Sequence, residues 1–403
     1  MIIEPKIRGF ICTTAHPKGC EQNVLEQINY VKAQGKFPGP KNVLVIGAST
    51  GYGLASRIAA AFGTQANTIG VFFERPADQR RPASAGWYNT AAFEKFAHAA
   101  HLYAKSVNGD AFSNDIKQQT AELIRQDLGK IDLIIYSLAS PRRIHPDTGE
   151  IFSSTLKPVG QEFTSKTVDP FSGEVKEVTL PPASEVEVAN TVAVMGGDDW
   201  ERWIDFLAQE NLLAEGVKTV AYSYIGPALT HAIYKDGTIG QAKAHLQKTA
   251  KKLTHTLEKL HGEAVVSVNK ALVTQASAAI PVVPLYISLL FKVMKAKGTH
   301  EDCIAQIVRL YQDHLYTQHP HPRDAEGLIR IDDWEMDPAV QNAIFEIWEK
   351  VNSVNVETLT DIESYRDEFR RLFGFGLEGV DYTVDVDPVV EIESINESEV
   401  SRV

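Results

Sequence analysis

The stretch Val43-Leu-Val-Ile-Gly-Ala-Ser-Thr-Gly-Tyr-Gly-Leu54 decides the fold that this sequence predicts. Four apolar residues are followed by Gly47, Gly51 and Gly53 and then by a helical pattern, which predicts a buried strand, a tight turn and a helix. Such a turn exposes backbone N–H groups at a helix N-terminus, where the pyrophosphate of a dinucleotide binds. The spacing is G-x-x-x-G-x-G rather than G-x-G-x-x-G, and glycines needed only for packing would produce a similar pattern.

Composition narrows the class of protein. The chain has 403 residues and a formal net charge of -12, which disfavours attraction to the phosphates of nucleic acids. Its three cysteines have no metal-ligand spacing and are typical of reduced thiols in the cytoplasm. The most apolar stretch, 278–294, contains Pro281, Pro284 and Lys292 and falls short of the ~20 residues of a membrane span. We expect a cytoplasmic protein without a metal, a membrane or a nucleic-acid partner.

Strand and helix patterns alternate from residue 41 onward, which predicts an α/β fold with a doubly wound parallel sheet of the Rossmann type. The predicted strands are 43–46, 68–73, 102–107, 133–138, 219–224 and, as the last one, 265–268. We interpret 1–403 as a single domain. Its expected parts are an N-terminal elaboration (1–40, with a strand at 7–13 and a helix at 23–33), a Rossmann core (41–277) with an irregular insertion (140–182), a helical substrate-side region (278–380) and an acidic, solvated tail (381–403).

Two carboxylates follow predicted strands. Glu74 stands where a dinucleotide fold places the acid that binds the adenosine ribose, and its charge would repel a 2′-phosphate and so favour NADH over NADPH. The alternative is an ordinary exposed glutamate beside Arg75. Asp110 could accept a hydrogen bond from the adenine amino group, or it could be a helix N-cap.

Tyrosine and lysine are the residues from which we infer the reaction. No tyrosine has a lysine four positions on, as short-chain dehydrogenases do, but Tyr234 and Lys243 stand either side of Gly237 and Gly240. The tyrosine can therefore lie in a loop while the lysine lies on the following helix, with both facing one cleft. Tyr224 ends a predicted strand and supplies a second phenol at the same edge.

Other combinations are weaker. Tyr286 and Lys295 have the same gap but fall within one predicted helix, so their side chains diverge. The histidine cluster His314, His319 and His321 has no carboxylate at a helical offset of four, which disfavours a metal site.

The chain resembles the NADH-dependent trans-2-enoyl-ACP/enoyl-CoA reductases of the FabV type. The resemblance runs through almost the whole sequence and is carried by these motifs: Arg8-Gly-Phe-Ile, His16-Pro-x-Gly-Cys20, Gly47-Ala-Ser-Thr-Gly-Tyr-Gly53, Phe73-Glu-Arg-Pro76, Gly86-Trp-Tyr-Asn89, Tyr136-Ser-Leu-Ala-Ser-Pro-Arg-Arg143, Met195-Gly-Gly-Asp-Asp-Trp200, Lys270-Ala-Leu-Val-Thr-Gln-Ala-Ser277 and Phe373-Gly-Phe-Gly376.

The resemblance implies a cytoplasmic, often monomeric enzyme of bacterial fatty-acid elongation. Tyr234 would be the catalytic tyrosine, Lys243 the cofactor-binding lysine and Tyr224 a contact to the acyl thioester. The implied NADH-lining residues are Gly47, Ala48, Ser49, Thr50, Gly51, Tyr52, Phe73, Glu74, Asp110, Ala111, Leu138, Ala139, Lys243, Leu272, Val273 and Thr274.

The residue types suit that chemistry. Hydride addition to the β-carbon of an enoyl thioester places negative charge on the thioester oxygen, and a phenol aimed at that oxygen stabilises it. The substrate would be carried by acyl carrier protein or by CoA. The stretch 278–294 could be a wall for the acyl chain or plain core, and Lys292, Lys295 and Lys297 could meet phosphates or be solvated. A carbonyl reductase and an NADH-binding protein without turnover remain the alternatives.

Overall fold

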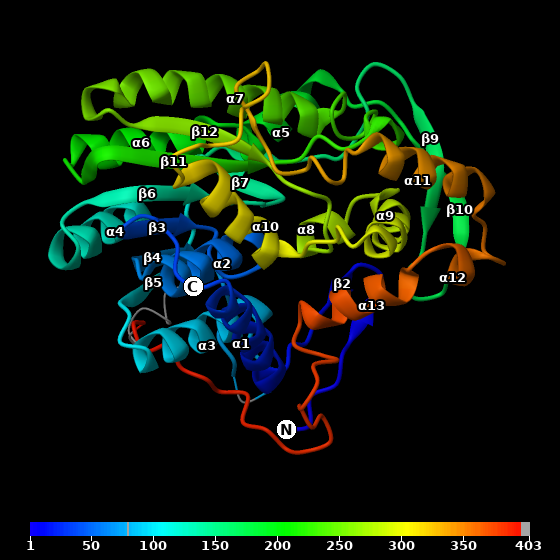
Figure 1. Cartoon of the computed structure of the whole chain (residues 1–403), viewed down its shortest axis with the longest axis horizontal. Helices are drawn as coiled ribbons and strands as arrows, with labels where there is room; N and C mark the ends of the chain where they lie inside the picture. Colours follow the sequence, from blue (N-terminus) through cyan, green and yellow to red (C-terminus); the bar gives the residue numbers. More distant parts are fainter. Residues whose placement is uncertain (79, 396–403) are drawn as a thin grey trace.

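The computed structural model describes residues 1–78 and 80–395, and a seven-stranded parallel sheet is its central feature (Figure 1). Across the sheet the strands are β13 (Ile329–Arg330), β12 (Glu263–Val268), β11 (Leu213–Ser223), β6 (Ile131–Tyr136), β3 (Asn42–Ile46), β4 (Asn67–Phe72) and β5 (Ala104–Asn108). The chain order reverses between β3 and β6, which is the switch point of a Rossmann fold. The predicted fold class is therefore confirmed, and the glycine turn after β3 lies at that switch point.

Helices cover both faces of the sheet, as parallel strands require. Val43 and Val45 of β3 face one helical layer, whereas Leu44 and Ile46 face the other. The first layer contains α1 (Pro17–Ala33), α2 (Gly51–Ile58), the π-helix η1 (Ala59–Thr64), α3 (Ala85–Ala99), α10 (Cys303–Leu310) and the π-helix η4 (Tyr311–Leu315). The second contains α4 (Asn114–Asp127), α6 (Asp198–Gln209) and α7 (Thr238–Leu257), with η3 (Glu258–Leu260) after α7.

The N-terminal elaboration differs from the predicted strand and helix. Residues 7–13 form a hairpin of β1 (Ile7–Arg8) and β2 (Ile11–Cys12) rather than one strand, because the chain reverses at Gly9, whose φ is +59°. Helix α1 begins at Pro17, six residues before the predicted start. Proline is well suited to the first helical turn, and the Nδ1 atom of His16 caps the helix by accepting from the Gly19 N–H.

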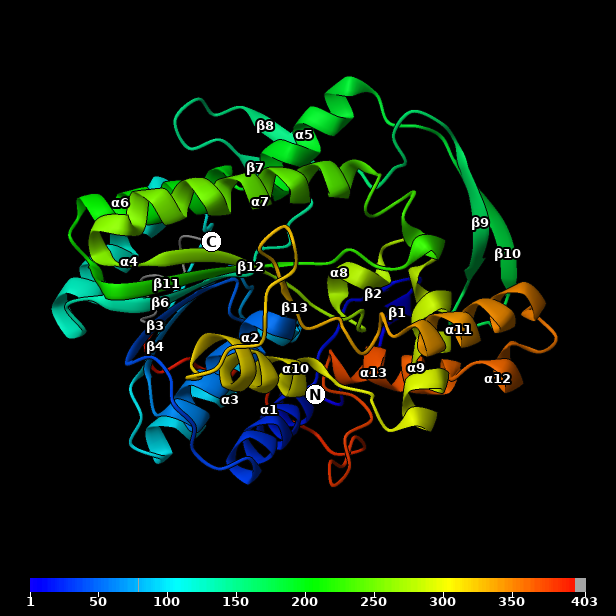
Figure 2. The same cartoon turned by 45° about the horizontal axis from the view of Figure 1, so that its top comes forward.

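The insertion at 140–182 contains regular structure that was not predicted. Two antiparallel hairpins form, β7 (Arg142–Ile144) with β8 (Ile151–Ser153), and β9 (Phe163–Val168) with β10 (Val175–Leu180). Helix α5 (Glu185–Met195) follows, with a Ser184 capping box. The β9–β10 hairpin lies beside the C-terminal helices (Figure 2). Its strands carry polar side chains such as the cross-strand pair Thr164 and Thr179, so the sequence lacks the usual apolar signal of a strand.

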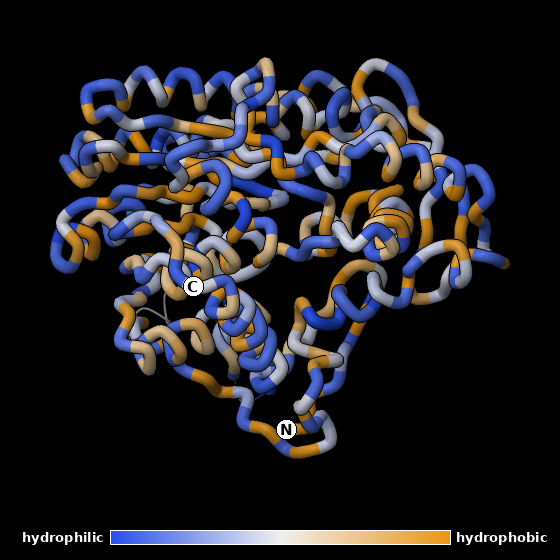
Figure 3. The backbone as a smooth tube through the Cα atoms, viewed as in Figure 1, coloured by the Kyte–Doolittle hydropathy of each residue, from blue (hydrophilic) through white to orange (hydrophobic). Residues whose placement is uncertain are grey.

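The C-terminal part is mostly helical, as predicted, but 265–268 is not the last strand. The two residues of β13 pair with the end of β12, a contact too short to leave a sequence pattern. The helices are α8 (Gln275–Ala278), α9 (Val283–Lys297), α11 (Pro338–Lys350), α12 (Val356–Leu359) and α13 (Ile362–Arg371). Helix α9 is apolar along most of its length (Figure 3). Among the described residues, no helix has both the length and the apolar character that crossing a bilayer requires.

The acidic side chains of the segment 381–395 are exposed to solvent, as predicted, but other residues of the segment pack on the protein; residues 396–403 of the predicted tail lie outside the described part. Trp87 and Tyr88 donate hydrogen bonds to the carbonyls of Val390 and Pro388. Further along, Ser394 bonds through its backbone N–H and its hydroxyl to the buried carboxylate of Glu94, which also faces the buried Arg57. The C-terminal segment therefore closes over the layer that contains α3.

We predict that Ser394→Ala lowers the free energy of unfolding by about 1–3 kcal/mol, because a buried carboxylate loses one of its donors. Urea unfolding of the whole protein measures the change. Glu391→Gln, at an exposed position of the same segment, is the control and should change it by less than about 0.5 kcal/mol. Equal effects would show that the segment does not depend on the Ser394 contact.

Candidate functional site

The carboxyl edge of the parallel sheet gathers the predicted site residues, because each group of them directly follows a strand. In strand order from β5 to β12, the groups are Asp110 and Ala111; Phe73 and Glu74; Gly47 to Tyr52; Leu138 and Ala139; Tyr224; and Leu272 to Thr274. Tyr234 and Lys243 belong to the connection between β11 and β12.

The glycines of the turn have two different roles. A Cβ atom on Gly47 would lie 2.2 Å from the carbonyl oxygen of Ser137, and one on Gly53 would lie 1.8 Å from the carbonyl oxygen of Gly47. These two glycines are therefore required by packing, as the alternative interpretation held. Gly51 is different: its φ is +52°, and a Cβ there would meet only Thr274 Cγ2, at 3.8 Å. Gly51 thus faces open space between two segments of the predicted site.

The start of α2 leaves donors free for an anion. Thr50 is the N-cap residue, but within the described part of the chain its side chain makes no capping hydrogen bond, and the first turn contains no acid. The first N–H groups of a helix have no partner within the helix, and they carry its positive dipole end. Anions bind at such an N-terminus, so Gly51 and its neighbours can receive a phosphate.

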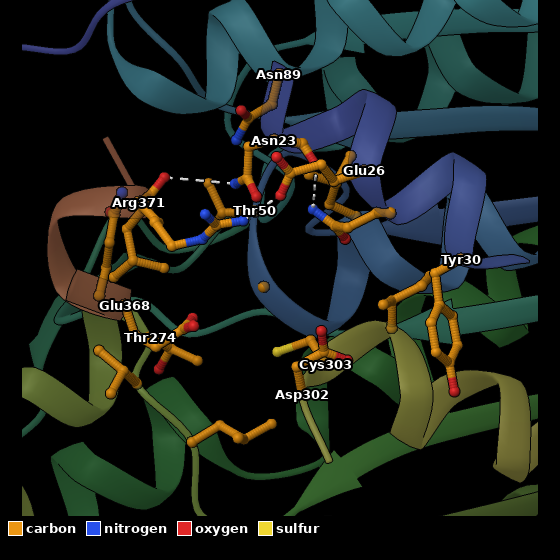
Figure 4. Close-up of a pocket in the computed structure, with 18 of the residues that line it drawn as sticks. Asn23, Glu26, Tyr30, Thr50, Asn89, Thr274, Asp302, Cys303, Glu368 and Arg371 are labelled. Atoms are coloured by element: carbon orange, nitrogen blue, oxygen red, sulfur yellow. Dashed lines mark hydrogen bonds and ion pairs between the residues drawn. The ribbon is translucent and has the colours of Figure 1, made fainter. Parts of the chain in front are cut away.

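A cavity of about 280 Å³ opens at this turn (Figure 4). Thr50 and Gly51 form one side of it and Thr274 another. Helices α1, α10 and α13 supply much of the remaining wall, including the ion pair between Glu26 and Arg371, and Asn89 of α3 and Phe291 of α9 also line the cavity. The cavity therefore connects the glycine turn with the loop after β12, both of which are predicted cofactor segments.

Glu74 is held in place rather than free in solvent. Its carboxylate accepts a hydrogen bond from the Ser49 hydroxyl at 2.7 Å, and its burial raises the pKa of the carboxyl. The motif Gly86-Trp-Tyr-Asn89 explains this position: a Cβ on Gly86 would lie 2.0 Å from Glu74 Oε1, and Asn89 donates to the Ser49 carbonyl. The neighbouring Phe73 is 62% exposed, so its ring is available to a ligand at the strand end.

The loop at Asp110 and Ala111 is fixed by a buried ion pair. Ser113 caps α4, so the alternative role of Asp110 as the N-cap is wrong; its carboxylate accepts from the N–H of Phe112. The Nζ of Lys117 donates to the Ala111 carbonyl at 2.9 Å and pairs with Asp199 at 2.8 Å. The backbone that would meet the adenine is therefore rigidly supported.

The tyrosine pair lies at the end of β11. Tyr224 follows the strand, and Tyr234 lies in a turn after the short helix η2 (Ala228–Thr230), as the intervening glycines predict. Their rings meet edge to face, with centroids 4.7 Å apart. Burial raises the pKa of the Tyr234 phenol, so the hydroxyl stays protonated. Among the described residues, Tyr234 has no hydrogen-bond partner for this hydroxyl.

Lys243 lies in the second turn of α7 and is half-buried. Its Nζ donates to the Tyr222 carbonyl at 3.0 Å, two residues before Tyr224. Burial lowers the pKa of this lysine to about 8. The lysine is therefore held at the carboxyl end of β11, the strand that Tyr224 follows, and its ammonium group has further N–H donors for a ligand.

Glu335 is a member of this site that was not predicted from the sequence. Its buried carboxylate accepts hydrogen bonds from Tyr224 and from Tyr286, the tyrosine set aside because of its helical position. The local sequence gave no signal for it, because the two residues of β13, Ile329 and Arg330, are too few for a strand pattern and the acidic residues that follow resemble an exposed turn.

Comparisons with known proteins agree on one family. Residues 81–316 match the family model described as the trans-2-enoyl-CoA reductase catalytic region, residues 2–79 match its NAD(P)H binding domain, and residues 323–386 match an enoyl reductase FAD binding domain.

Individual relatives are similar to this chain over nearly its whole length. An enoyl-[acyl-carrier-protein] reductase [NADH] of Coxiella burnetii is 63% identical over 98% of both chains, and one of Flavobacterium johnsoniae is 61% identical over 98% of this chain and all of its own. Among solved structures, the trans-2-enoyl-CoA reductase of Treponema denticola in complex with NAD is 52% identical, with a TM-score of 0.94, over 97% of this chain and 100% of the other.

The two glycine roles predict different costs of substitution. Gly53→Ala should lower the free energy of unfolding by about 3 kcal/mol or more, because backbone must move to admit the new Cβ. Gly51→Ala should cost only about 1 kcal/mol, for its left-handed φ, since there is room for a methyl group. Urea unfolding of both variants measures the two costs. A larger loss of stability for Gly51→Ala than for Gly53→Ala would contradict the conclusion that packing requires glycine at position 53 and not at position 51.

Proposed function

Because the chain belongs to the trans-2-enoyl-CoA reductase family, we propose that Tyr234 stabilises the charge that develops when this enzyme reduces an enoyl thioester. The enzyme uses NADH to reduce the trans-2 double bond to the saturated acyl thioester. One observation carries the role of Tyr234: in the described structure it is the buried phenol at the carboxyl edge of the sheet whose hydroxyl has no protein partner.

The residues fit NADH. Gly51 leaves room for the pyrophosphate, and the α2 N-terminus supplies N–H donors to it. In this proposal Glu74 accepts hydrogen bonds from the adenosine ribose hydroxyls, and Lys243 binds the nicotinamide ribose. The remaining proposed contacts follow the same strand ends and are Gly47, Ala48, Ser49, Thr50, Tyr52, Phe73, Asp110, Ala111, Leu138, Ala139, Leu272, Val273 and Thr274. When bound, NADH supplies the hydride.

Tyr234 acts on the thioester oxygen of the substrate. As the β-carbon gains hydride, negative charge grows on that oxygen, and a donor already in place lowers the barrier without reorganising water. The surroundings keep the phenol protonated, since burial raises its pKa. Lys243 adds a positive charge nearby, which favours the developing anion.

The apolar stretch 278–294 is mainly core. Leu285, Ile287, Leu289 and Leu290 of α9 are fully buried against neighbouring helices, which supports the plain interpretation over that of an acyl-chain wall. The three lysines are also engaged: Lys292 with the Thr358 carbonyl, Lys295 with Asp361 and Lys297 with Asp337. These contacts do not favour either acyl carrier protein or CoA as the carrier.

A flavin is not supported by residues 323–386, although the matching family model is described as FAD binding. The glycines Gly374, Gly376 and Gly379 follow helix α13 rather than a strand. Gly374 packs on the protein, since a Cβ there would lie 2.5 Å from the Cys20 N atom. The turn between β13 and α11 in this segment contains no glycine, so the segment lacks the glycine-rich turn between strand and helix that cradles a dinucleotide, and we derive no step through a flavin.

We further propose that the enzyme acts in the cytoplasm, as a monomer, on thioesters of acyl carrier protein or CoA, and that it has neither a nucleic-acid nor a membrane partner. The net charge of -12 supports the exclusion of nucleic acid. We also propose that the chain is a single domain: Glu335, from the region 278–380, bonds to Tyr224, from the region 41–277.

Tyr234→Phe should lower kcat with crotonyl-CoA by about 10²- to 10³-fold, because one hydrogen-bond donor to the oxygen is lost. Stopped-flow NADH oxidation measures the rate, and NADH fluorescence titration should show an unchanged Kd. A 3-oxoacyl thioester assayed in parallel separates enoyl reduction from carbonyl reduction. A variant that retains the wild-type rate would refute the role of Tyr234.

Glu74→Ala should weaken NADH binding and narrow the preference for NADH over NADPH by about tenfold or more, because the carboxylate that repels a 2′-phosphate is gone. Kd values for both cofactors measure the effect. Asp78→Ala is the control, since it removes the same charge at an exposed position of the segment that follows β4. An unchanged preference in Glu74→Ala would contradict the ribose contact.

A further inference from the structure

A buried carboxylate lies directly behind the tyrosine pair. Glu335 is in the turn between β13 and α11, and none of its surface is exposed. Its Oε1 accepts from the Tyr224 hydroxyl at 2.9 Å and from the Tyr286 hydroxyl at 2.7 Å, and its Oε2 accepts from the Ala271 N–H at 2.8 Å. Burying a charged group costs free energy unless hydrogen bonds compensate it. The three donors to Glu335 provide this compensation.

The hydrogen-bond donors around Glu335 favour the ionised form of its carboxyl, against the effect of burial. Every side-chain hydrogen bond that the structure gives Glu335 is one that it accepts, and buried Lys270 adds a nearby positive charge. Burial raises the pKa of Glu335, and Asp332 acts in the same direction, whereas Lys270, Tyr286 and the Ala271 N–H oppose them. Three donors satisfy the oxygens, so the ionised form is the one that fits the geometry.

The carboxylate of Glu335 accepts the hydrogen bond that the Tyr224 hydroxyl donates. Because Tyr224 donates its hydrogen to Glu335, it does not have that hydrogen to give to a substrate oxygen in this arrangement. Tyr234 keeps its hydrogen free, and its ring packs edge to face on the held ring of Tyr224. The two phenols therefore have different roles: Tyr224 donates to Glu335, and Tyr234 is free to donate to a substrate. This differs from the expectation that both contact the thioester.

The loop that carries Glu335 is held in position by a side chain of α11. The side-chain amide of Gln341 donates to the Glu335 carbonyl at 2.7 Å and to the Tyr286 hydroxyl at 3.1 Å. Both partners are thereby fixed by α11, which lies outside the Rossmann core. The position of the carboxylate is set independently of the strand end that carries Tyr224.

We propose that Glu335 is a positioning residue: its carboxylate holds the Tyr224 ring against Tyr234 and so aims the free Tyr234 hydroxyl at the thioester oxygen. This inference rests on the proposed role of Tyr234. It gives the region 278–380, through Glu335, a part in the reductase active site.

A double-mutant cycle with Glu335→Gln and Tyr224→Phe tests the proposal. Glutamine keeps the shape but removes the charge, and kcat with crotonyl-CoA should fall about 10- to 100-fold because the donor is misplaced. In the Tyr224→Phe background the same change should cost less than about threefold, since the link is already broken. Additive losses in the two backgrounds would overturn the proposal.

Two further measurements separate positioning from simple support of the fold. Tyr286→Phe removes a donor from the same carboxylate oxygen but keeps the hydrogen bond between Tyr224 and Glu335, and it should cost less than about threefold in kcat. A structural role acting through Ala271 would instead raise the NADH Kd of Glu335→Gln without lowering kcat, and that result would also overturn the proposal.

If Glu335→Gln does not yield folded protein, Glu335→Asp takes its place in the cycle, because it retains the charge and shortens the reach to Tyr224. Tyr234→Phe is assayed in the same series. A fully active Tyr234→Phe would refute the proposed role of Tyr234, whereas additive Glu335 and Tyr224 effects in an enzyme that depends on Tyr234 would refute the positioning role alone.

Discussion

The close approach of two backbone segments at the start of α2 is the constraint on which the rest of the structure depends. With a hydrogen atom at position 53, the helix can pass against the carbonyl of Gly47, where any side chain would collide. This contact places the helix N-terminus at the edge of the sheet. The phosphate donors, the open space at Gly51 and the neighbouring carboxylate of Glu74 all take their positions from it.

The chemistry of the site is assembled from three parts of the chain. The first strands supply the cofactor groups, β11 and the connection after it supply Tyr224, Tyr234 and Lys243, and the segment beyond β13 supplies Glu335. A parallel sheet makes this possible because all its strands end at one edge. The helices added after the sheet then reach the same edge from outside and fix what the strands present.

The sequence predicted the parts of the molecule whose patterns are local. Apolar runs locate the strands, and the glycines between Tyr234 and Lys243 indicate that the two belong to separate elements. Glu335 could not be found in this way, because its contact joins residues 111 apart. The strand β13 is too short for a periodicity, and the acidic composition of 381–395 conceals backbone carbonyls that Trp87 and Tyr88 bind.

The hydrogen bonds between Ser394 and Glu94 also affect how the chain folds while it is being synthesised. Glu94 leaves the ribosome 300 residues before the serine that completes its hydrogen bonding. The strands and helices around Glu94 can collapse early during translation, but the hydrogen bonding of this carboxylate stays incomplete until residue 394 emerges. A chain that stops before residue 394 therefore keeps a buried carboxylate, that of Glu94, without two of its hydrogen-bond donors.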